Sequence, residues 1–494
     1  MKSSRLAFIV CMGVLCVLTS LSAHQTPSGR HRHRFYRFVD LGTFGGPLSI
    51  VAFGEESQNS HGAFVGNSDT AIPDPFAPNC FFSPNCLVNR GFKWDEGVLR
   101  QLPALGPTAE SEAHGINERG VVVGQAQTGA VDSTGFPVFR AVMWKDRQVM
   151  NLGTLSKNPS PAFLGANGSG ALAVNNLDQA TGIGVTDIPD PTAPGSTQIH
   201  GFFWDGKMHD LGTLGGPFSF AGSVNDLGQV GGVSTTAPDP VTGQSVQRAF
   251  IWERGHMFDV GTLGGTFGDG LALNNRGQAI GSSTLAGDTE LHGFLWERGK
   301  IRDLGTLGGT FSSTQWLSEN GHVAGLASLA DEFVHGFLWR DDKMEDLGTL
   351  DDDPCSVAEA MNSKDQVVGI SSPDCGEGGR AFLWEDGEMV DLNKLIPAGS
   401  SLQLVYSLHI NDRGEILGIG VPAGVDPVNV EQSGHAYALI PLDPDRYGYY
   451  QCDGSEHVKN AGPENPRARE AASRMISRSV QKVRDGRKLR WRQR

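Results

Sequence analysis

The sequence of 494 residues lacks the short motifs that mark common enzyme classes. It contains no Gly-x-Ser-x-Gly nucleophile elbow, no phosphate-binding loop and no His-Glu-x-x-His motif. After residue 23, no apolar run approaches the roughly 20 residues that a membrane span needs. No pair of cysteines has the Cys-x-x-Cys spacing of a zinc site. The sequence therefore predicts no membrane span, no metal site and no cofactor.

Cysteine is also scarce, and only five of the seven lie beyond residue 23. In an oxidising compartment these residues are expected to pair. Cys80 and Cys86 stand in one loop, and Cys355 and Cys375 flank two strands of one repeat unit, so both pairs are predicted disulfides. Cys452 is then odd, either free or used between molecules.

Positive charge is rare outside the two ends of the chain. The net charge of the whole chain is −15, although residues 1–34 and 445–494 are both basic. The part between them is therefore strongly acidic, and it repels nucleic acid and anionic membranes. We expect no nucleic-acid partner, and we expect the charge to serve solubility.

The ends of the chain differ from its middle. Residues 1–23 combine a positive start, an apolar run and small residues, as a secretory signal peptide does; an anchor helix is the alternative. Residues 24–34 form a linker rich in His and Arg, and residues 443–494 form a basic tail that is expected to be disordered. Residues 35–442 remain as one large domain of a secreted protein, extracellular or periplasmic.

That domain is repetitive. The stretch from His292 to Leu350 contains His-Gly-Phe-Leu-Trp twice and Asp-Leu-Gly-Thr-Leu twice, with a period of 43 residues. Each period holds four short phrases rich in β-branched and aromatic residues, and turn residues such as Asn-x-x-Gly join them. Four antiparallel strands in each period are typical of a β-propeller blade.

Eight copies of the phrases predict an all-β, eight-bladed β-propeller of four-stranded antiparallel blades, with seven blades as the alternative. The first copy is a lone fourth strand, Arg37 to Gly42, and the last unit has only three strands. The N-terminal strand is therefore expected to complete the last blade and close the ring, which would remove unpaired edges.

Recurring sequence triplets in this domain resemble those of a known family of repeats. Asp-Leu-Gly-Thr-Leu-Gly-Gly recurs together with triplets such as His292-Gly293-Phe294 and Arg248-Ala249-Phe250, each followed by a Trp. Over about residues 35–440 the chain resembles the HAF repeat family, described as probable extracellular repeats. The second unit departs, with Val142 in place of the aromatic residue and Gln101-Leu102-Pro103 in place of Asp-Leu-Gly. The resemblance implies export and a repeat fold, and it implies no established activity or catalytic residues.

The third phrase of every unit begins with His or Arg, and an acidic or amide residue begins the fourth. A two-residue turn at Arg298-Gly299 would pair Phe294 with Asp303 and make His292 its diagonal neighbour. Arg alternates freely with His at this position, which excludes a metal role there. We predict a basic–acidic bond that holds each blade together.

Catalytic residues are expected where the repeat is broken. Most residues just before the turn Asn are small or apolar, and the exceptions are Glu56, His114, Glu359 and His409. These four fall in units that become neighbours when the ring closes. Carboxylates beside His could support hydrolysis or lyase chemistry. A hydrated channel wall is the plainer interpretation.

Binding residues are expected on the variable loops between the second and third strands. Three of these loops contain Pro-Asp-Pro, which places Asp74, Asp190 and Asp239 in the predicted contact. The sequence therefore favours a secreted, non-enzymatic binding or scaffold protein that contacts an extracellular protein or glycan through this face. The alternative is a propeller hydrolase or lyase that acts on an extracellular polymer.

Overall fold

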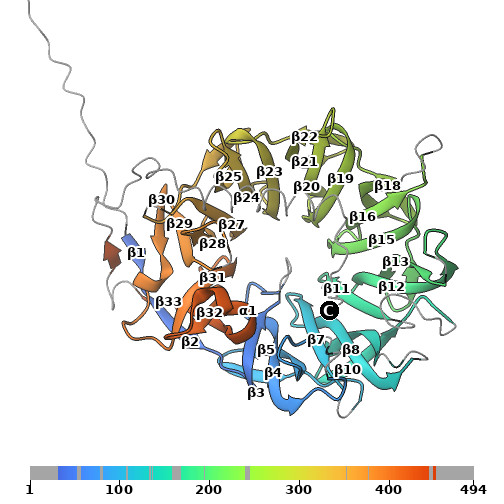
Figure 1. The fold of residues 1–494 in the computed structure, drawn as a ribbon, viewed down its shortest axis with the longest axis horizontal. Coiled ribbons are helices and arrows are strands. Elements are labelled where there is room, and N and C mark those ends of the chain that lie inside the picture. Colours follow the sequence, from blue (N-terminus) through green and yellow to red (C-terminus); the bar gives the residue numbers. More distant parts are fainter. Residues whose placement is uncertain are drawn as a thin grey trace, which may run out of the picture.

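The computed structural model describes residues 32–451 with short gaps at 53–56, 78–79, 81, 107–108, 133–134, 136, 158–167, 194, 240–244, 352, 377 and 444–448. The regular elements of the described chain are almost all β-strands (Figure 1). Its helical elements are η1 (Leu392–Lys394), η2 (Pro427–Asn429) and α1 (Val430–Ser433). The predicted signal peptide and nearly all of the predicted tail lie outside the described residues.

The strands form repeated four-stranded antiparallel units, which we call blades one to eight in chain order. Blade one contains β3 (Gly45–Val51), β4 (Phe64–Pro73), β5 (Leu87–Asp95) and β6 (Val98–Gln101). Blade two contains β7 (Ser111–Ile116), β8 (Val122–Val131), β9 (Pro137–Lys145) and β10 (Gln148–Gly153). Blade three contains β11 (Ser169–Val174), β12 (Ala180–Pro189), β13 (Thr197–Trp204) and β14 (Met208–Asp210). Blade four contains β15 (Gly215–Val224), β16 (Val230–Thr236), β17 (Gln247–Glu253) and β18 (His256–Asp259).

The second half of the chain repeats the pattern. Blade five contains β19 (Gly264–Leu273), β20 (Gln278–Leu285), β21 (Leu291–Glu297) and β22 (Lys300–Asp303). Blade six contains β23 (Gly308–Leu317), β24 (Val323–Leu329), β25 (Val334–Arg340) and β26 (Lys343–Asp346). Blade seven contains β27 (Cys355–Met361), β28 (Val367–Ser372), β29 (Arg380–Glu385) and β30 (Glu388–Asp391). Blade eight contains β31 (Leu402–Ile410), β32 (Ile416–Pro422) and β33 (His435–Pro441), and its fourth strand is β2 (Tyr36–Asp40).

The blades are arranged around a common centre (Figure 1). The first strands of neighbouring blades contact one another from β7 to β31, and we call these seven the inner strands. Single parallel bridges join blade three to four and blade five to six, so each of these pairs counts as one eight-stranded sheet. The prediction of an all-β fold with four-stranded antiparallel blades is confirmed, and the chain has a β-propeller fold.

The N-terminal strand β2 pairs with β33, from Tyr36 opposite Pro441 to Asp40 opposite Tyr437. The structure differs from the sequence-based boundaries just outside this strand. β1 (Arg32–Arg34), in the predicted linker, pairs with β34 (Tyr449–Gln451), in the predicted tail. His33 is buried there, and its Nδ1 lies 2.7 Å from Oε1 of Glu385 in blade seven.

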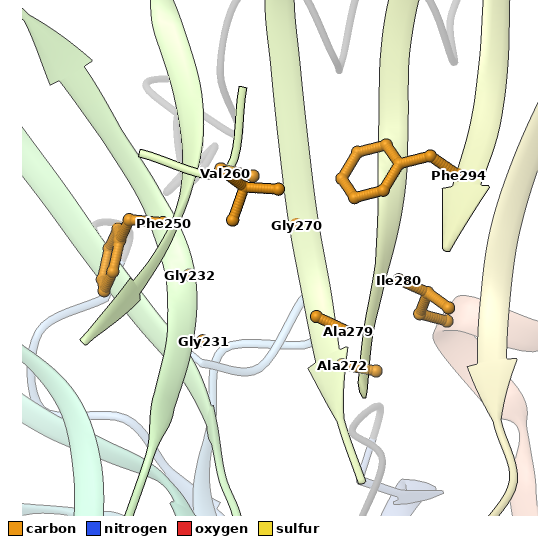
Figure 2. A pocket seen from close by; sticks show the side chains of 10 residues that line it. Gly231, Gly232, Phe250, Val260, Gly270, Ala272, Ala279, Ile280 and Phe294 are labelled. Carbon is orange, nitrogen blue, oxygen red and sulfur yellow. The ribbon is translucent and has the colours of Figure 1, made fainter. Parts of the chain in front are cut away.

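Apolar side chains fill the spaces between neighbouring blades. Figure 2 shows this packing between blades four and five, where Phe250 and Phe294 lie on either side of Gly270. The remaining space is only about 10 Å³ and is lined by apolar side chains and glycine. A space of this size barely holds one water molecule, so it is a packing gap rather than a ligand site.

Both predicted disulfides are confirmed: Cys80 is bonded to Cys86, and Cys355 to Cys375. Cys452 lies outside the described residues. Among the described residues, no helix has the length and apolar character that crossing a membrane requires.

Candidate functional site on the inner strands

In blades two to eight, the first strand contains an extra residue relative to the strand that pairs with it. This extra residue follows the residue that pairs with the glycine recurring in each second strand. In blade two, Ala113 pairs with Gly124 and Gly115 with Val123, so His114 is the extra residue of a β-bulge. A bulge redirects a side chain and is frequent next to functional sites. The residues at this position in blades two to eight are His114, Leu172, Gly222, Leu271, Gln315, Glu359 and Leu408.

His114 is one of the two ionisable residues at this position, and it lies beside a carboxylate. Its Nε2 is 3.4 Å from Oε2 of Glu112, two residues earlier on β7, and its Nδ1 is 2.8 Å from the carbonyl oxygen of Ala171 in blade three. Gln125 on β8 donates from Nε2 to the same oxygen of Glu112 at 2.8 Å. The pair therefore lies between blades two and three, and neighbouring strands hold both of its members.

These contacts determine the protonation state of the imidazole. A carbonyl oxygen only accepts hydrogen bonds, so Nδ1 of His114 carries a proton. If the ring were neutral, Nε2 would be an acceptor facing another acceptor. Burial opposes the charged ring, but the hydrogen bond and charge of Glu112 and the carbonyl of Ala171 outweigh it and raise the pKa of His114. The raised pKa and these two contacts favour the charged, imidazolium form of His114.

The pair is still accessible. About 21% of the His114 side chain and 17% of the Glu112 side chain are exposed. A partly exposed imidazolium beside a carboxylate can donate a proton to a leaving group, and the carboxylate can accept one from water. Glu112 was not among the residues selected from the sequence. The alternation of side chains along a strand, which puts Glu112 and His114 on one face, would have identified it.

His409 occupies a different environment from His114. It is buried, and its Nε2 lies 2.6 Å from Oγ of Ser57 in the chain segment of blade one. Its ring also packs edge-to-face against the ring of Trp316, with 5.9 Å between the two ring centroids. Burial lowers the pKa of His409 to about 4, only partly opposed by the carbonyl of Ala52. A neutral, buried ring of this kind joins blade eight to blade one and is poorly placed to exchange protons with a substrate.

The other two sequence candidates are placed as follows. Glu359 is the bulge residue of β27 in blade seven and is half-buried. Glu56 lies outside the described residues. Among the residues that the structure describes, no group of three His, Cys, Asp or Glu side chains could hold a metal ion. Of the sequence candidates, His114 lies beside a carboxylate, that of Glu112, with which it could transfer a proton.

The predicted loop face contains three aspartates in different settings. Asp74 is buried, with 3% of its surface exposed, and its Oδ1 accepts from the backbone N–H of Phe76 at 2.8 Å. Asp190 accepts in the same way from Thr192 at 2.7 Å, while Asp239 is exposed. The loop of Asp74 begins only after Pro73, because β4 and β5 extend until Pro73 pairs with Leu87. Asp74 and Asp190 therefore shape their turns, and their role in binding stays a prediction.

The predicted basic–acidic bonds are confirmed in blades three to eight, whereas Arg90 and Arg140 of blades one and two bond to the backbone carbonyls of Ala109 and Phe139. Phe294 pairs with Asp303, and Nδ1 of His292 lies 2.9 Å from Oδ1 of that aspartate. Equivalent contacts join His200 to Asp210, His335 to Asp346, His435 to Asp40, Arg248 to Asp259 and Arg380 to Asp391. Each bond connects the third strand of a blade to its fourth strand, so these residues stabilise blades and form no separate site.

Comparisons with known proteins found similarity to solved structures only. No family model and no curated protein matches it. Among solved structures it is similar to the β-propeller domain of the Trilobed protease from Pyrococcus furiosus, with 10% identity, a TM-score of 0.42, and coverage of 70% of this chain and 98% of that one. It is also similar to Pyrococcus horikoshii acylaminoacyl peptidase, with 10% identity, a TM-score of 0.40, and coverage of 76% and 58%.

A third similar structure is a puromycin-hydrolyzing peptidase from Mycobacterium tuberculosis, with 12% identity, a TM-score of 0.36, and coverage of 80% of this chain and 63% of that chain. This chain thus spans less than two thirds of the length of either whole peptidase. The prediction of a non-enzymatic binding or scaffold protein is contradicted by this comparison, because the similar structures are peptidases or part of a protease. The likeness itself gives only the fold and assigns no residue a role.

Proposed function

We propose that this protein is an exported hydrolase that acts on an extracellular polymer through His114 and Glu112. The observation that carries the proposal is the pair of contacts of the His114 ring. Nδ1 donates to the carbonyl of Ala171 at 2.8 Å, and Nε2 faces Oε2 of Glu112 at 3.4 Å. This arrangement keeps a proton on a partly exposed imidazole beside a base.

The proposed scaffold is a closed propeller of eight blades built from HAF-type repeats. The five paired positions between β2 and β33 support closure, because they join the first repeated strand to the last blade. A contact between blades one and eight adds support: Asn85 donates from Nδ2 to the carbonyl of Gln432 at 3.1 Å. The two disulfides support export, since such bonds persist in oxidising compartments.

The proposed reaction is general acid–base hydrolysis. The imidazolium of His114 gives the proton on Nε2 to the leaving atom as the bond in the polymer breaks. A water molecule supplies the hydroxyl group that forms the new bond, and its proton passes to the carboxylate of Glu112. That proton then returns to Nε2 of His114, which restores the imidazolium. One such positioned acid typically contributes a factor of about 10²–10⁴ in rate.

The test is an activity screen of the secreted protein with polysaccharides and polypeptides, which follows new reducing ends and new amines. His114→Ala and Glu112→Gln should each lower the rate at least about 100-fold. His209→Ala is the matched control, because His209 also pairs with a carboxylate, Asp205, at 2.8 Å but lies on β14. An active protein whose rate is insensitive to both inner-strand substitutions would overturn the proposal. Formation of an unsaturated product would identify a lyase instead.

A further inference from the structure

Blade two departs from the repeat inside its core. In other blades, an aromatic residue on the third strand lies over the glycine of the second strand, namely Phe92, Phe250, Phe294, Phe337, Phe382 and Tyr437. In blade two this residue is Val142, and the space over Gly124 is filled by Trp144: a Cβ built on Gly124 would lie 3.0 Å from its ring. Nε1 of Trp144 donates to the carbonyl of Pro103 at 2.7 Å, which fixes the ring in this buried position.

A cavity lies directly beside this substitution. It has a volume of about 560 Å³, which is within the usual range of small-molecule sites. Its apolar floor is formed by Leu102, Pro103, Val121, Val122 and Trp144. The walls come from β5 and β6 of blade one and from the strand-joining turns of blade two, on the side of the molecule opposite the variable loops.

The rim of this cavity is basic, although the blades as a whole are acidic. Its basic lining residues are Lys93, Arg100, Arg119, Lys145 and Arg147, and Asp146 is the one acidic residue of the lining. The five cations come from four separate segments of two blades. Their convergence on one cavity is therefore a feature of the fold, since no run of basic residues produces it.

Most of this positive charge is not neutralised by the protein. Arg119 and Lys145 share a single carboxylate, that of Asp178, and Nζ of Lys145 lies 2.8 Å from its Oδ2. Lys93 lies 3.5 Å from Asp95. Arg100 and Arg147 are exposed, and neither forms an ion pair with any residue in the described part of the chain. A guanidinium group without an ionic partner can bind a carboxylate, sulfate or phosphate group through two parallel N–H···O hydrogen bonds.

We propose that this cavity, here called the blade-two cleft, binds a small molecule that carries at least two oxyanion groups. The apolar floor receives the body of the ligand, and Arg100 and Arg147 hold its anionic groups at the rim. The site is independent of the His114–Glu112 pair and does not require the proposed hydrolase activity. It also differs from the loop face that the sequence favoured for binding.

Calorimetric titration with tripolyphosphate and with a disulfated disaccharide tests this proposal. Wild-type protein should bind at least one of them saturably, and the tighter of the two identifies the source of the oxyanions. Combined Arg100→Ala and Arg147→Ala substitutions should weaken binding at least about tenfold, because two charge-assisted contacts are lost. Binding should also weaken as salt concentration rises.

Arg254→Ala is the matched control. Arg254 lies in the two-residue turn between β17 and β18 of blade four, one position before the equivalent of Arg147 in blade two, and it is almost fully exposed. It should leave binding unchanged. Absence of saturable binding by either probe would overturn the proposal, as would equal weakening by Arg254→Ala, which would indicate only a general effect of charge.

A Val142→Phe variant adds a second readout. Displacement of Trp144 into the cleft should abolish binding, while thermal unfolding shows that the protein folds.

Discussion

Nδ2 of Asn117 donates a hydrogen bond of 2.9 Å to the backbone carbonyl of Asn175, the equivalent turn residue of the next blade. Meanwhile Oδ1 of Asn117 accepts from the backbone N–H of Val121 in its own turn. The sequence indicated only the second role, that of initiating a turn. Five other asparagines donate the equivalent hydrogen bond from Nδ2 to a backbone carbonyl of the next blade, namely Asn59, Asn175, Asn225, Asn274 and Asn362.

Ser318 interrupts this series in blade six. It accepts the bond from Asn274 through its carbonyl, but a serine has no amide with which to reach Asn362. Ser318→Asn should therefore add one hydrogen bond between blades and stabilise the fold by about 1 kcal/mol. Asn225→Ala should destabilise it by about 1–3 kcal/mol, because it leaves buried groups unpaired. Urea unfolding measures both, and an unchanged or lower midpoint for Ser318→Asn would contradict this account of the turns.

Removal of the N-terminal strand should weaken the last blade. A deletion from Arg34 to Gly42 removes β2, exposes the edge of β33 and takes away Tyr36, which is 3% exposed in the apolar cluster of blades seven and eight. We expect a lower melting temperature and aggregation, since an unpaired edge invites association. Differential scanning calorimetry and light scattering check both effects. If the deletion variant melts and scatters like the full chain, blade eight does not depend on this strand.

The two disulfides should contribute unequally. The bond from Cys355 to Cys375 closes a separation of 20 residues, whereas that from Cys80 to Cys86 closes only 6. Loop-closure entropy predicts losses of about 3 and about 2 kcal/mol when each pair is replaced by serine. The first loss should be larger still, because both of its cysteines are buried against Phe311 and Val334. Chemical denaturation of the two double variants tests this order, and the reverse order would refute it.

Features that depend on one blade could be predicted from the sequence. The pairing of Phe294 with Asp303 follows from the length of a two-residue turn, and the contact of His292 with this aspartate follows from the pairing. Both disulfides follow from short separations within one unit. These predictions succeed because local geometry fixes each of them.

Features that depend on contacts between blades could not be predicted in this way. The carbonyl of Ala171 holds His114, and the inward turn of Trp144 depends on Pro103 in the preceding connection. Asp74 was predicted to lie in a binding contact because its variable loop contains Pro-Asp-Pro, yet its side chain is buried. A repeated sequence shows which residues break the pattern. It does not show what the neighbouring blade places against them.

Glu110 is a buried carboxyl group that gives a pH-dependent prediction. It is 1% exposed at the start of blade two, where Oε1 accepts from the backbone N–H of Asn89 at 3.1 Å and Oε2 accepts from Nε2 of Gln127 at 2.6 Å. Burial raises the pKa of Glu110 to about 8. The charges of Asp74 and Glu112 add to this effect, and the N–H of Asn89 and the charge of Arg90 oppose it. The folded protein therefore keeps Glu110 protonated at neutral pH.

A raised pKa means that the folded state binds the proton of Glu110 more tightly than the unfolded state does. In the unfolded state this carboxyl group has its ordinary pKa of 4.5. The resulting stability is fully present below about pH 4.5 and is lost as the pH rises to about 8. Glu110→Gln stays neutral at every pH, so the stability of the wild type relative to this variant should fall by about 2–5 kcal/mol between pH 5 and pH 8. Urea unfolding of both proteins at the two pH values measures this difference, with Glu96→Gln, an exposed turn residue of blade one, as the control. A difference that stays constant with pH would show that Glu110 is ionised in the folded protein.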